Sequence, residues 1–265
     1  MKLAFMSFSA VNMSAAELAD EAKRLGYEGV EPRLSANHAH GIENGISKQA
    51  ADEFKKIFSD RGVAICCLAT SCGFSDPKTI NNNIDSAKQT IDLAVMLGVK
   101  RIRVFGGIIP EGVTREEAVQ SVTGAFITLA DYIGSEDVVL CMETHDSWCD
   151  PDDVANVIKS VSRNSIMVNW DLMHPVMTAK KTMKEAFDVL KPWIKHVHAH
   201  DGIAEGDKRS LVPIGQGQVD HKTALSLLKE AGYKDYISGE WIASGNMEFE
   251  NNHLEREFGL LKRLL

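Results

Sequence analysis

Acidic and histidine side chains stand at the ends of four short apolar segments. The segments 137–143, 166–171, 194–198 and 236–240 end in Glu143, Asp171, His198 and Glu240. Short apolar runs bounded by turn and helix signals are typical of buried strands. A charge at the end of a buried strand is costly unless something compensates it, and a shared metal ion is the simplest compensator for four such groups. The sequence therefore predicts a metal site.

Three carboxylates and one imidazole suit Mn²⁺, Mg²⁺, Co²⁺ or Zn²⁺ and leave positions open for water or substrate. In the competing interpretation, each residue forms a separate salt bridge with a lysine or arginine inside the fold. For any one residue alone the salt bridge is favoured, because buried acids are usually paired. Four such residues at matching strand ends favour one shared divalent metal ion.

Further polar residues follow the same strand ends. His174, three residues after Asp171, could contact metal or substrate, or cap the loop before Pro175. His196, His198 and His200 alternate and so face one side of a strand, which leaves His198 and His200 as competing ligands. His145 could touch substrate, while Asp146 could cap a turn.

Two arginines complete the candidate site. Glu31-Pro-Arg33 ends an apolar segment, and a salt-bridged pair is favoured there over a substrate clamp. Arg209 lies in a long loop between the last two strands, and long loops of this kind tend to carry function. We treat His38, His40, His221 and His253 as surface or structural residues.

Strands and helices alternate along the whole chain. Gly26 ends a helix that opens with the capping box Ser14–Glu17, and Thr114–Glu117 opens another, through about 133. Ser47 and Asp150 begin further helices. Strict alternation implies a parallel sheet, and eight units close into a single (β/α)₈ TIM barrel over residues 1–265. The expected strands are 2–7, 28–33, 63–70, 100–105, 137–143, 166–171, 194–200 and 235–241; the remaining helices lie near 80–97, 182–191, 220–231 and 246–264.

Bulk properties exclude several classes of protein. The net charge of −8 argues against a nucleic-acid or anionic-membrane surface, which would need a basic face. We expect no signal peptide and no membrane span. The five cysteines indicate reduced, buried thiols in a cytoplasmic protein. A homo-oligomer, either a dimer or a tetramer, is our expectation for a barrel of this kind.

Several motifs, in order along nearly the whole chain, resemble the xylose isomerase-like TIM-barrel superfamily. The similarity is greatest to its sugar phosphate isomerase/epimerase branch, which includes ketose 3-epimerases. The strings that carry it are Gly26–Arg33, Leu140–Asp146, Asn169–Pro175, His196–Asp201, Arg209 with Pro213–Asp220, and Ser238–Glu240.

The resemblance implies roles for individual residues. It implies metal ligation by Glu143, Asp171, His198 and Glu240, with His198 rather than His200 as the strand-seven ligand. It also implies that His174 and Arg209 contact substrate oxygens. Related apurinic endonucleases hold three zinc ions with additional histidines, which are missing here after the third and fourth strands. The trinuclear site and a DNA substrate are therefore not expected.

The expected chemistry is proton transfer next to a carbonyl group. A ketose or related hydroxy-carbonyl compound would chelate the metal, which stabilises an enediolate. Glu143 and Glu240 would remove and return the proton, giving epimerisation or isomerisation. The same groups could serve a lyase, a dehydratase or decarboxylase acting on a sugar-derived keto acid or inosose. A non-catalytic sugar-binding protein is disfavoured, because binding alone does not need paired carboxylates.

Overall fold

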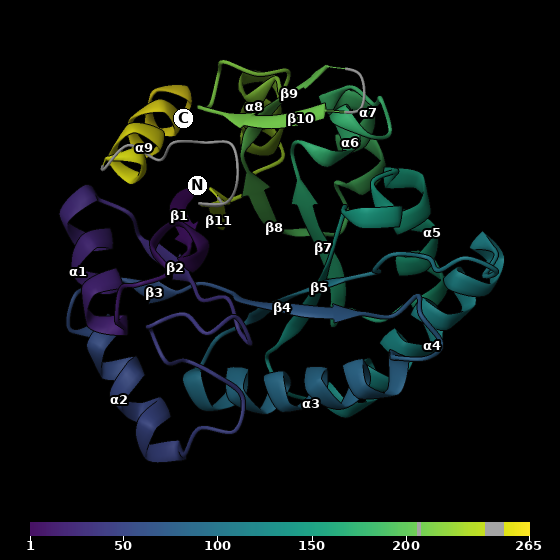
Figure 1. Ribbon diagram of the computed structural model, residues 1–265, viewed down its shortest axis with the longest axis horizontal. Coiled ribbons are helices and arrows are strands. Elements are labelled where there is room, and N and C mark those ends of the chain that lie inside the picture. The colour runs from purple at the N-terminus through teal and green to yellow at the C-terminus, as the bar shows by residue number, and fades with distance from the viewer. Residues whose placement is uncertain (206–207, 242–251) are drawn as a thin grey trace.

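The computed structural model describes residues 1–205, 208–241 and 252–265, and for Glu205, Lys208 and Arg209 only the backbone. Parallel strands form a nearly closed barrel, and helices surround it (Figure 1). This confirms the predicted TIM barrel. In spatial order the sheet contains β3 (Ala64–Ile65), β2 (Gly29–Glu31), β1 (Lys2–Met6), β11 (Tyr236–Gly239), β8 (Ile194–Ala199), β7 (Ile166–Asp171), β6 (Val139–Glu143), β5 (Arg101–Phe105) and β4 (Leu68–Gly73).

The expected third strand, 63–70, is divided in two. β3 pairs with β2, and β4 pairs with β5, while Cys66 and Cys67 lie between them. The chain therefore pairs with the preceding strand before this point and with the following strand after it. A single bridge between Arg33 and Ala69 joins the two edges and nearly closes the barrel.

The long segment between the last two barrel strands contains an additional hairpin. β9 (Asp201–Glu205) and β10 (Lys208–Val212) pair antiparallel, with Arg209 opposite Ala204. The two strands are too short and polar to show a clear alternation in the sequence. The extra length between the last two barrel strands was predicted, but its strand structure was not.

Local sequence signals explain the helix boundaries. The capping boxes of Ser14 and Thr114 are both formed, and Thr182 forms a third. Gly26 ends α1 with φ of 93°, a conformation that favours glycine. The main helices are α1 (Ala15–Leu25), α2 (Lys48–Ser59), α3 (Ile80–Leu97), α4 (Arg115–Ile133), α5 (Pro151–Val161), α7 (Met183–Leu190), α8 (His221–Glu230) and α9 (His253–Leu264). The expected start of the last helix, 246–251, lies outside the described residues.

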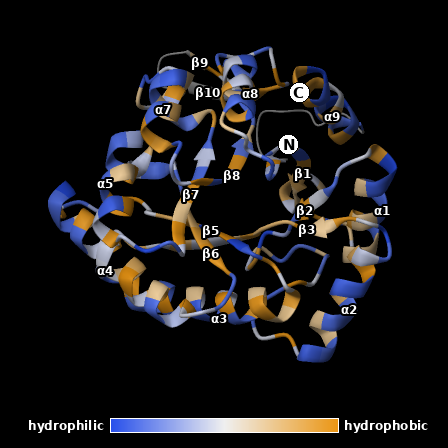
Figure 2. Ribbon diagram, turned by 180° about the vertical axis from the view of Figure 1, so that it is seen from behind, coloured by the Kyte–Doolittle hydropathy of each residue, from blue (hydrophilic) through white to orange (hydrophobic). Residues whose placement is uncertain are grey.

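The core lies between the strands and the surrounding helices. Hydrophobic residues line the strands and the helix faces turned toward them, whereas the outer helix faces are hydrophilic (Figure 2). All five cysteines are buried, as expected. Among the described residues, no helix is both long and apolar enough to cross a bilayer. The barrel interior is different, because it holds charged side chains at the carboxyl ends of the strands.

Candidate metal centre

The four predicted metal ligands meet at the carboxyl ends of their strands. Glu143 and Asp171 end β6 and β7, His198 lies near the end of β8, and Glu240 directly follows β11. Their ligand atoms all lie within 4.8 Å of one another. The first three are fully buried, and Glu240 is 6% exposed. The parallel register explains why these residues lie close together. It places Asp171 of β7 and Ser238 of β11 on either side of His198, and Glu240 follows two residues after Ser238.

His198 occupies the middle of this group, which we call the metal cluster. Its Nδ1 atom lies 3.1 Å from Glu143 Oε1 and 3.2 Å from Glu240 Oε2. Burial alone would lower the pKa of His198, but the carboxylates of Glu31 and Glu143 outweigh burial and raise it well above its usual value. The same residues therefore attract positive charge to this position.

The donor atoms of the metal cluster fit a divalent cation. Asp171 Oδ2 and Glu240 Oε2 are buried, and each faces an imidazole nitrogen, His200 Nε2 at 2.7 Å and His198 Nδ1 at 3.2 Å. Burial would raise the pKa of Glu240, but the hydrogen bond and charge of His198 lower it to about 2. Buried ionised oxygens that converge on one point are costly, and a metal ion would compensate them together.

Asp171 is held in place by the backbone. Its Oδ1 atom accepts hydrogen bonds from the N–H groups of Met173 and His174, both at 2.8 Å. Its Oδ2 atom lies 2.7 Å from His200 Nε2. His200 therefore lies beside a predicted ligand of the metal cluster, where a histidine can orient that ligand.

Arg103 is a member of the site that the sequence did not reveal. It lies on β5, is 1% exposed, and places its Nε atom 3.1 Å from Glu143 Oε2. It also donates to the carbonyl of Thr70 at 2.7 Å. One oxygen of Glu143 therefore forms the separate salt bridge of the competing interpretation, while the other oxygen faces His198. The available signal was an arginine between two apolar residues, Ile102 and Val104, in a short strand.

The expected salt bridge between Glu31 and Arg33 is wrong. Glu31 ends β2 and faces two histidines, with His196 Nε2 at 2.8 Å and His198 Nε2 at 3.1 Å. Arg33 instead bonds the carbonyls of Leu34 and Ala69 and the hydroxyl of Ser71. The two side chains separate because β2 ends at Glu31, and Arg33 turns toward the gap between β2 and β4.

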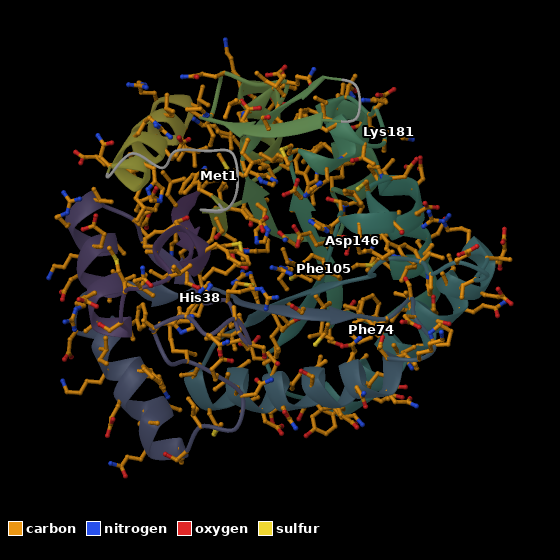
Figure 3. All side chains as sticks on the ribbon, viewed as in Figure 1. Met1, His38, Phe74, Phe105, Asp146 and Lys181 are labelled. Carbon is orange, nitrogen blue, oxygen red and sulfur yellow. The ribbon has the colours of Figure 1, made fainter. Side chains whose placement is uncertain are left out.

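The imidazole rings of His145, His174 and His200 lie in a row beside the metal cluster, and we call them the histidine row. The ring of His174 lies 4.2 Å from that of His145 and 5.4 Å from that of His200, measured between centroids. His145 also packs against Phe105 at 4.8 Å and forms an ion pair of 2.8 Å with Asp146. Figure 3 labels Phe105 and Asp146 near the barrel centre. Burial opposes protonation, but the hydrogen bond with Asp146 raises the pKa of His145 to about 9.

Two predicted substrate contacts remain, His174 and Arg209. His174 begins the short helix α6 (His174–Met177), and its ring lies between those of His145 and His200 in the histidine row. The backbone of Arg209 belongs to β10, and its side chain lies outside the described residues. Its contact with substrate stays a prediction.

Asp201 fixes the loop that follows the β9–β10 hairpin. Its carboxylate accepts hydrogen bonds from four backbone N–H groups, those of Gly202, Gly215, Gly217 and Val219, at 2.9 to 3.1 Å. A Cβ atom at Gly217 would lie 2.2 Å from Asp201 Oδ1, so this close approach needs glycine. Asp201 directly follows His200 and ties the end of β8 to this loop.

The fold and sequence are similar to those of known proteins. A family model described as "Xylose isomerase-like TIM barrel" matches residues 19–264. No curated protein matches the chain in sequence.

Solved structures share the fold over almost the whole chain. The IOLI protein with a bound zinc atom is 20% identical, with a TM-score of 0.80 and coverage of 100% of this chain and 96% of that one. A D-psicose 3-epimerase is 15% identical, with a TM-score of 0.79 and coverage of 99% and 98%. The probable 3-DHS dehydratase AsbF from Bacillus anthracis is 18% identical, with a TM-score of 0.77 and coverage of 99% of each chain. The TM-scores establish the shared fold, and the family match shows that the chain belongs to the xylose isomerase-like TIM-barrel family.

Proposed function

We propose that this protein is a divalent-metal-dependent isomerase or epimerase that acts on a ketose or a related hydroxy-carbonyl compound. The observation that carries the proposal is the metal cluster itself: Glu143, Asp171, His198 and Glu240, with ligand atoms within 4.8 Å. Clusters of buried acids are rare as structural features, and they are typical of sites where a metal ion and a substrate bind. The epimerase and the zinc-containing protein of the same fold support this choice.

A divalent cation held here would act as a Lewis acid toward the carbonyl and hydroxyl oxygens of the substrate. Glu143 and Glu240 then carry the protons. One carboxylate removes the proton bound to carbon, which leaves an enediolate, and a carboxylate returns a proton. Return to the opposite face of the same carbon gives an epimer. Return to the neighbouring carbon converts a ketose to an aldose.

The two glutamates differ in their surroundings. Glu143 Oε2 lies 3.1 Å from Arg103 Nε, whereas Glu240 Oε2 lies 3.2 Å from His198 Nδ1. We infer that Glu143 depends on Arg103 for its orientation and that Glu240 depends on His198.

The histidine row and Arg209 would bind the substrate. His145, His174 and His200 present imidazole nitrogens beside the metal cluster, where they can bond hydroxyl oxygens of a sugar. Arg209 would approach from β10 and share the developing negative charge. In this arrangement, the metal cluster would bind the reacting oxygens of the substrate, and the histidine row would bind the hydroxyl groups on its other carbon atoms.

A lyase acting on a sugar-derived keto acid is the second candidate, and Arg33 favours it. The residue is 8% exposed, and no carboxylate among the described residues lies within 4.0 Å of its guanidinium. An arginine of this kind suits a carboxylate on the substrate. The dehydratase of the same fold agrees with this candidate.

Solvent deuterium exchange distinguishes these reactions. The metal-loaded protein would be incubated in D₂O with a panel of ketoses and oxo-acids, and the products would be analysed by NMR and mass spectrometry. Deuterium at carbon without elimination is the expected result for an isomerase or epimerase. Loss of water or carbon dioxide would identify a lyase instead. No exchange with any compound would contradict both enzymes.

A further inference from the structure

Glu31 is a buried carboxylate that has no part in the proton transfers of the proposed reaction. It is fully buried at the end of β2, and no lysine or arginine in the described structure forms an ion pair with it. A buried charge of this kind is costly unless it is bonded. Its bonds go to two imidazoles of β8, those of His196 and His198.

The contacts of Glu31 assign the protons of His198. Both Glu31 oxygens lie near His198 Nε2, at 3.1 and 3.2 Å. An ionised carboxylate only accepts hydrogen bonds, so Nε2 is the nitrogen that carries hydrogen. A metal ion that takes the place of the proton on Nδ1 leaves one N–H, at Nε2, and a lone pair on Nδ1. The contact with Glu31 therefore favours the tautomer that can ligate a metal ion through Nδ1.

That lone pair points into the metal cluster. His198 Nδ1 lies 3.1 Å from Glu143 Oε1 and 3.2 Å from Glu240 Oε2. Without a metal ion, Nδ1 carries a proton that Glu143 Oε1 accepts; a divalent cation in place of that proton would bind the lone pair and both carboxylates. The arrangement is complementary to a metal ion ligated by Nδ1.

We propose that Glu31 is the positioning residue of the metal cluster: it binds the Nε2–H of His198 and so directs Nδ1 to the metal. The inference rests on the proposed metal-dependent function. β2 and β8 are not neighbours in the sheet, because β1 and β11 lie between them. Glu31 thus reaches across the barrel interior. His196, at 2.8 Å, holds the other side of its carboxylate.

Metal titration of Glu31 variants tests the proposal. Metal-free protein would be titrated calorimetrically with Zn²⁺ alone, with a competing chelator where binding is tight. Glu31→Ala removes the acceptor, and we expect its affinity to fall by about 10- to 100-fold, the usual effect of losing such a partner. Glu31→Gln keeps one acceptor oxygen, and we expect it to recover most of this loss.

His196→Phe is the matched control. It keeps an aromatic ring in the same buried position and removes the other hydrogen bond of Glu31, while His198 keeps its partner. We expect its Zn²⁺ affinity to stay within about threefold of the wild-type value, since only the partner of the ligating histidine has the full effect. Circular dichroism and urea unfolding of each metal-free variant would identify any that does not fold, in which case Glu31→Gln decides the result.

A spectroscopic measurement separates positioning from packing. In Co²⁺-loaded wild-type protein, we expect a hyperfine-shifted, exchangeable ¹H NMR signal from His198 Nε2–H, protected by Glu31. The signal should disappear by exchange in Glu31→Ala and return in Glu31→Gln.

Three outcomes would overturn the proposal. They are wild-type Zn²⁺ affinity in both Glu31 variants, an equal loss in His196→Phe, or a protected Nε2–H signal in Glu31→Ala. Failure of the wild-type protein to bind any divalent metal would instead overturn the proposed function, and this inference with it.

Discussion

At the scale of single residues, the two glutamates of the metal cluster carry the clearest prediction. Glu143→Gln and Glu240→Gln keep an amide oxygen that can coordinate metal, but an amide is no base at neutral pH. We expect each variant to keep its fold and some metal affinity and to lose about 10²- to 10⁴-fold in turnover. In a two-base epimerase, one variant can still exchange the substrate proton on its surviving face while net conversion stops. Exchange measured in D₂O alongside product formation tests this.

Two other outcomes would contradict proton transfer by both glutamates. Near wild-type turnover in both variants would mean that the carboxylates only hold the metal. Equal loss of exchange and conversion in both variants would favour a single-base isomerase or a lyase. Arg103→Met serves as the control for orientation, since it leaves both carboxylates in place and removes the ion pair of Glu143.

Two histidines, His198 near the end of β8 and His200 directly after this strand, differ in their predicted role. His198 lies among three carboxylates, whereas His200 contacts Asp171 at 2.7 Å. We expect His198→Ala to lose metal affinity by 100-fold or more, on the order of 3 kcal/mol. His200→Ala should lose about tenfold, the effect of removing an orienting partner. Metal analysis after dialysis, with titration of both variants, measures the difference. A larger loss in His200→Ala would assign the ligand two residues later in the chain.

The sequence predicted the metal cluster but not the residues that support it. Glu143, Asp171 and Glu240 are conspicuous because each ends an apolar segment, which is a local signal. Arg103 and Glu31 act through partners on strands far away in the sequence. Their contacts depend on which side chains meet inside the closed barrel, and no local pattern contains that information. The Glu31–Arg33 pair was predicted from adjacency alone and was wrong for this reason.

At the scale of elements, caps and apolar periodicity were sufficient for the helices and most strands. Ser14, Thr114 and Ser47 begin helices as predicted, because capping is a contact within four residues. The division of β3 and β4 was missed, since it results from a change of partner strand. The β9–β10 hairpin was missed because its pairing is antiparallel and outside the barrel repeat.

The loop after β10 provides a prediction at this scale. Asp201→Asn replaces one acceptor oxygen by an NH₂ group, so two of the four backbone N–H groups bound there lose their partner. Buried donors left unsatisfied cost about 1–3 kcal/mol each, so we expect a loss of about 2–6 kcal/mol in the free energy of unfolding. Urea denaturation at pH 7 measures it.

Asp220→Asn in the same loop is the matched control. Asp220 caps α8 through the N–H of Thr223, at 3.0 Å, and asparagine caps helices about as well as aspartate. We expect a change below about 0.5 kcal/mol. Similar losses in the two variants would show that Asp201 does not anchor the loop.

At the scale of the whole molecule, the metal cluster links metal to folding. Without a cation, the carboxylates of Glu143, Asp171 and Glu240 are buried close together around one imidazole. A metal that binds only the folded state stabilises it by about 2.7 kcal/mol at a free concentration 100 times its Kd. We expect a chelator to lower Tm and Zn²⁺ or Mn²⁺ to restore it. His198→Ala should show a smaller response, and an equal response would place the stabilising metal elsewhere.

Stability toward acid depends on a histidine outside the metal cluster. His40 is buried, its Nδ1 accepts a hydrogen bond of 3.0 Å from the N–H of Ile42, and burial together with the nearby His38 lowers its pKa to about 4. Because this pKa lies below the value of about 6.5 in an unfolded chain, the unfolded state binds the proton first as pH falls. The contribution of neutral His40 to the free energy of unfolding is complete above about pH 6.5. It is lost between about pH 6.5 and 4, and the total loss is about 3 kcal/mol.

His40→Asn tests this directly, because the amide oxygen can still accept from Ile42 but does not titrate. The variant will be less stable at pH 7, since a smaller side chain fills the same buried position. Its free energy of unfolding should nevertheless fall less steeply below pH 6.5, by about 3 kcal/mol over the interval to pH 4. Urea denaturation with a chelator present keeps metal release out of the comparison. The remaining buried histidines, such as His221, titrate in both proteins, so parallel curves for the two would contradict the role of His40.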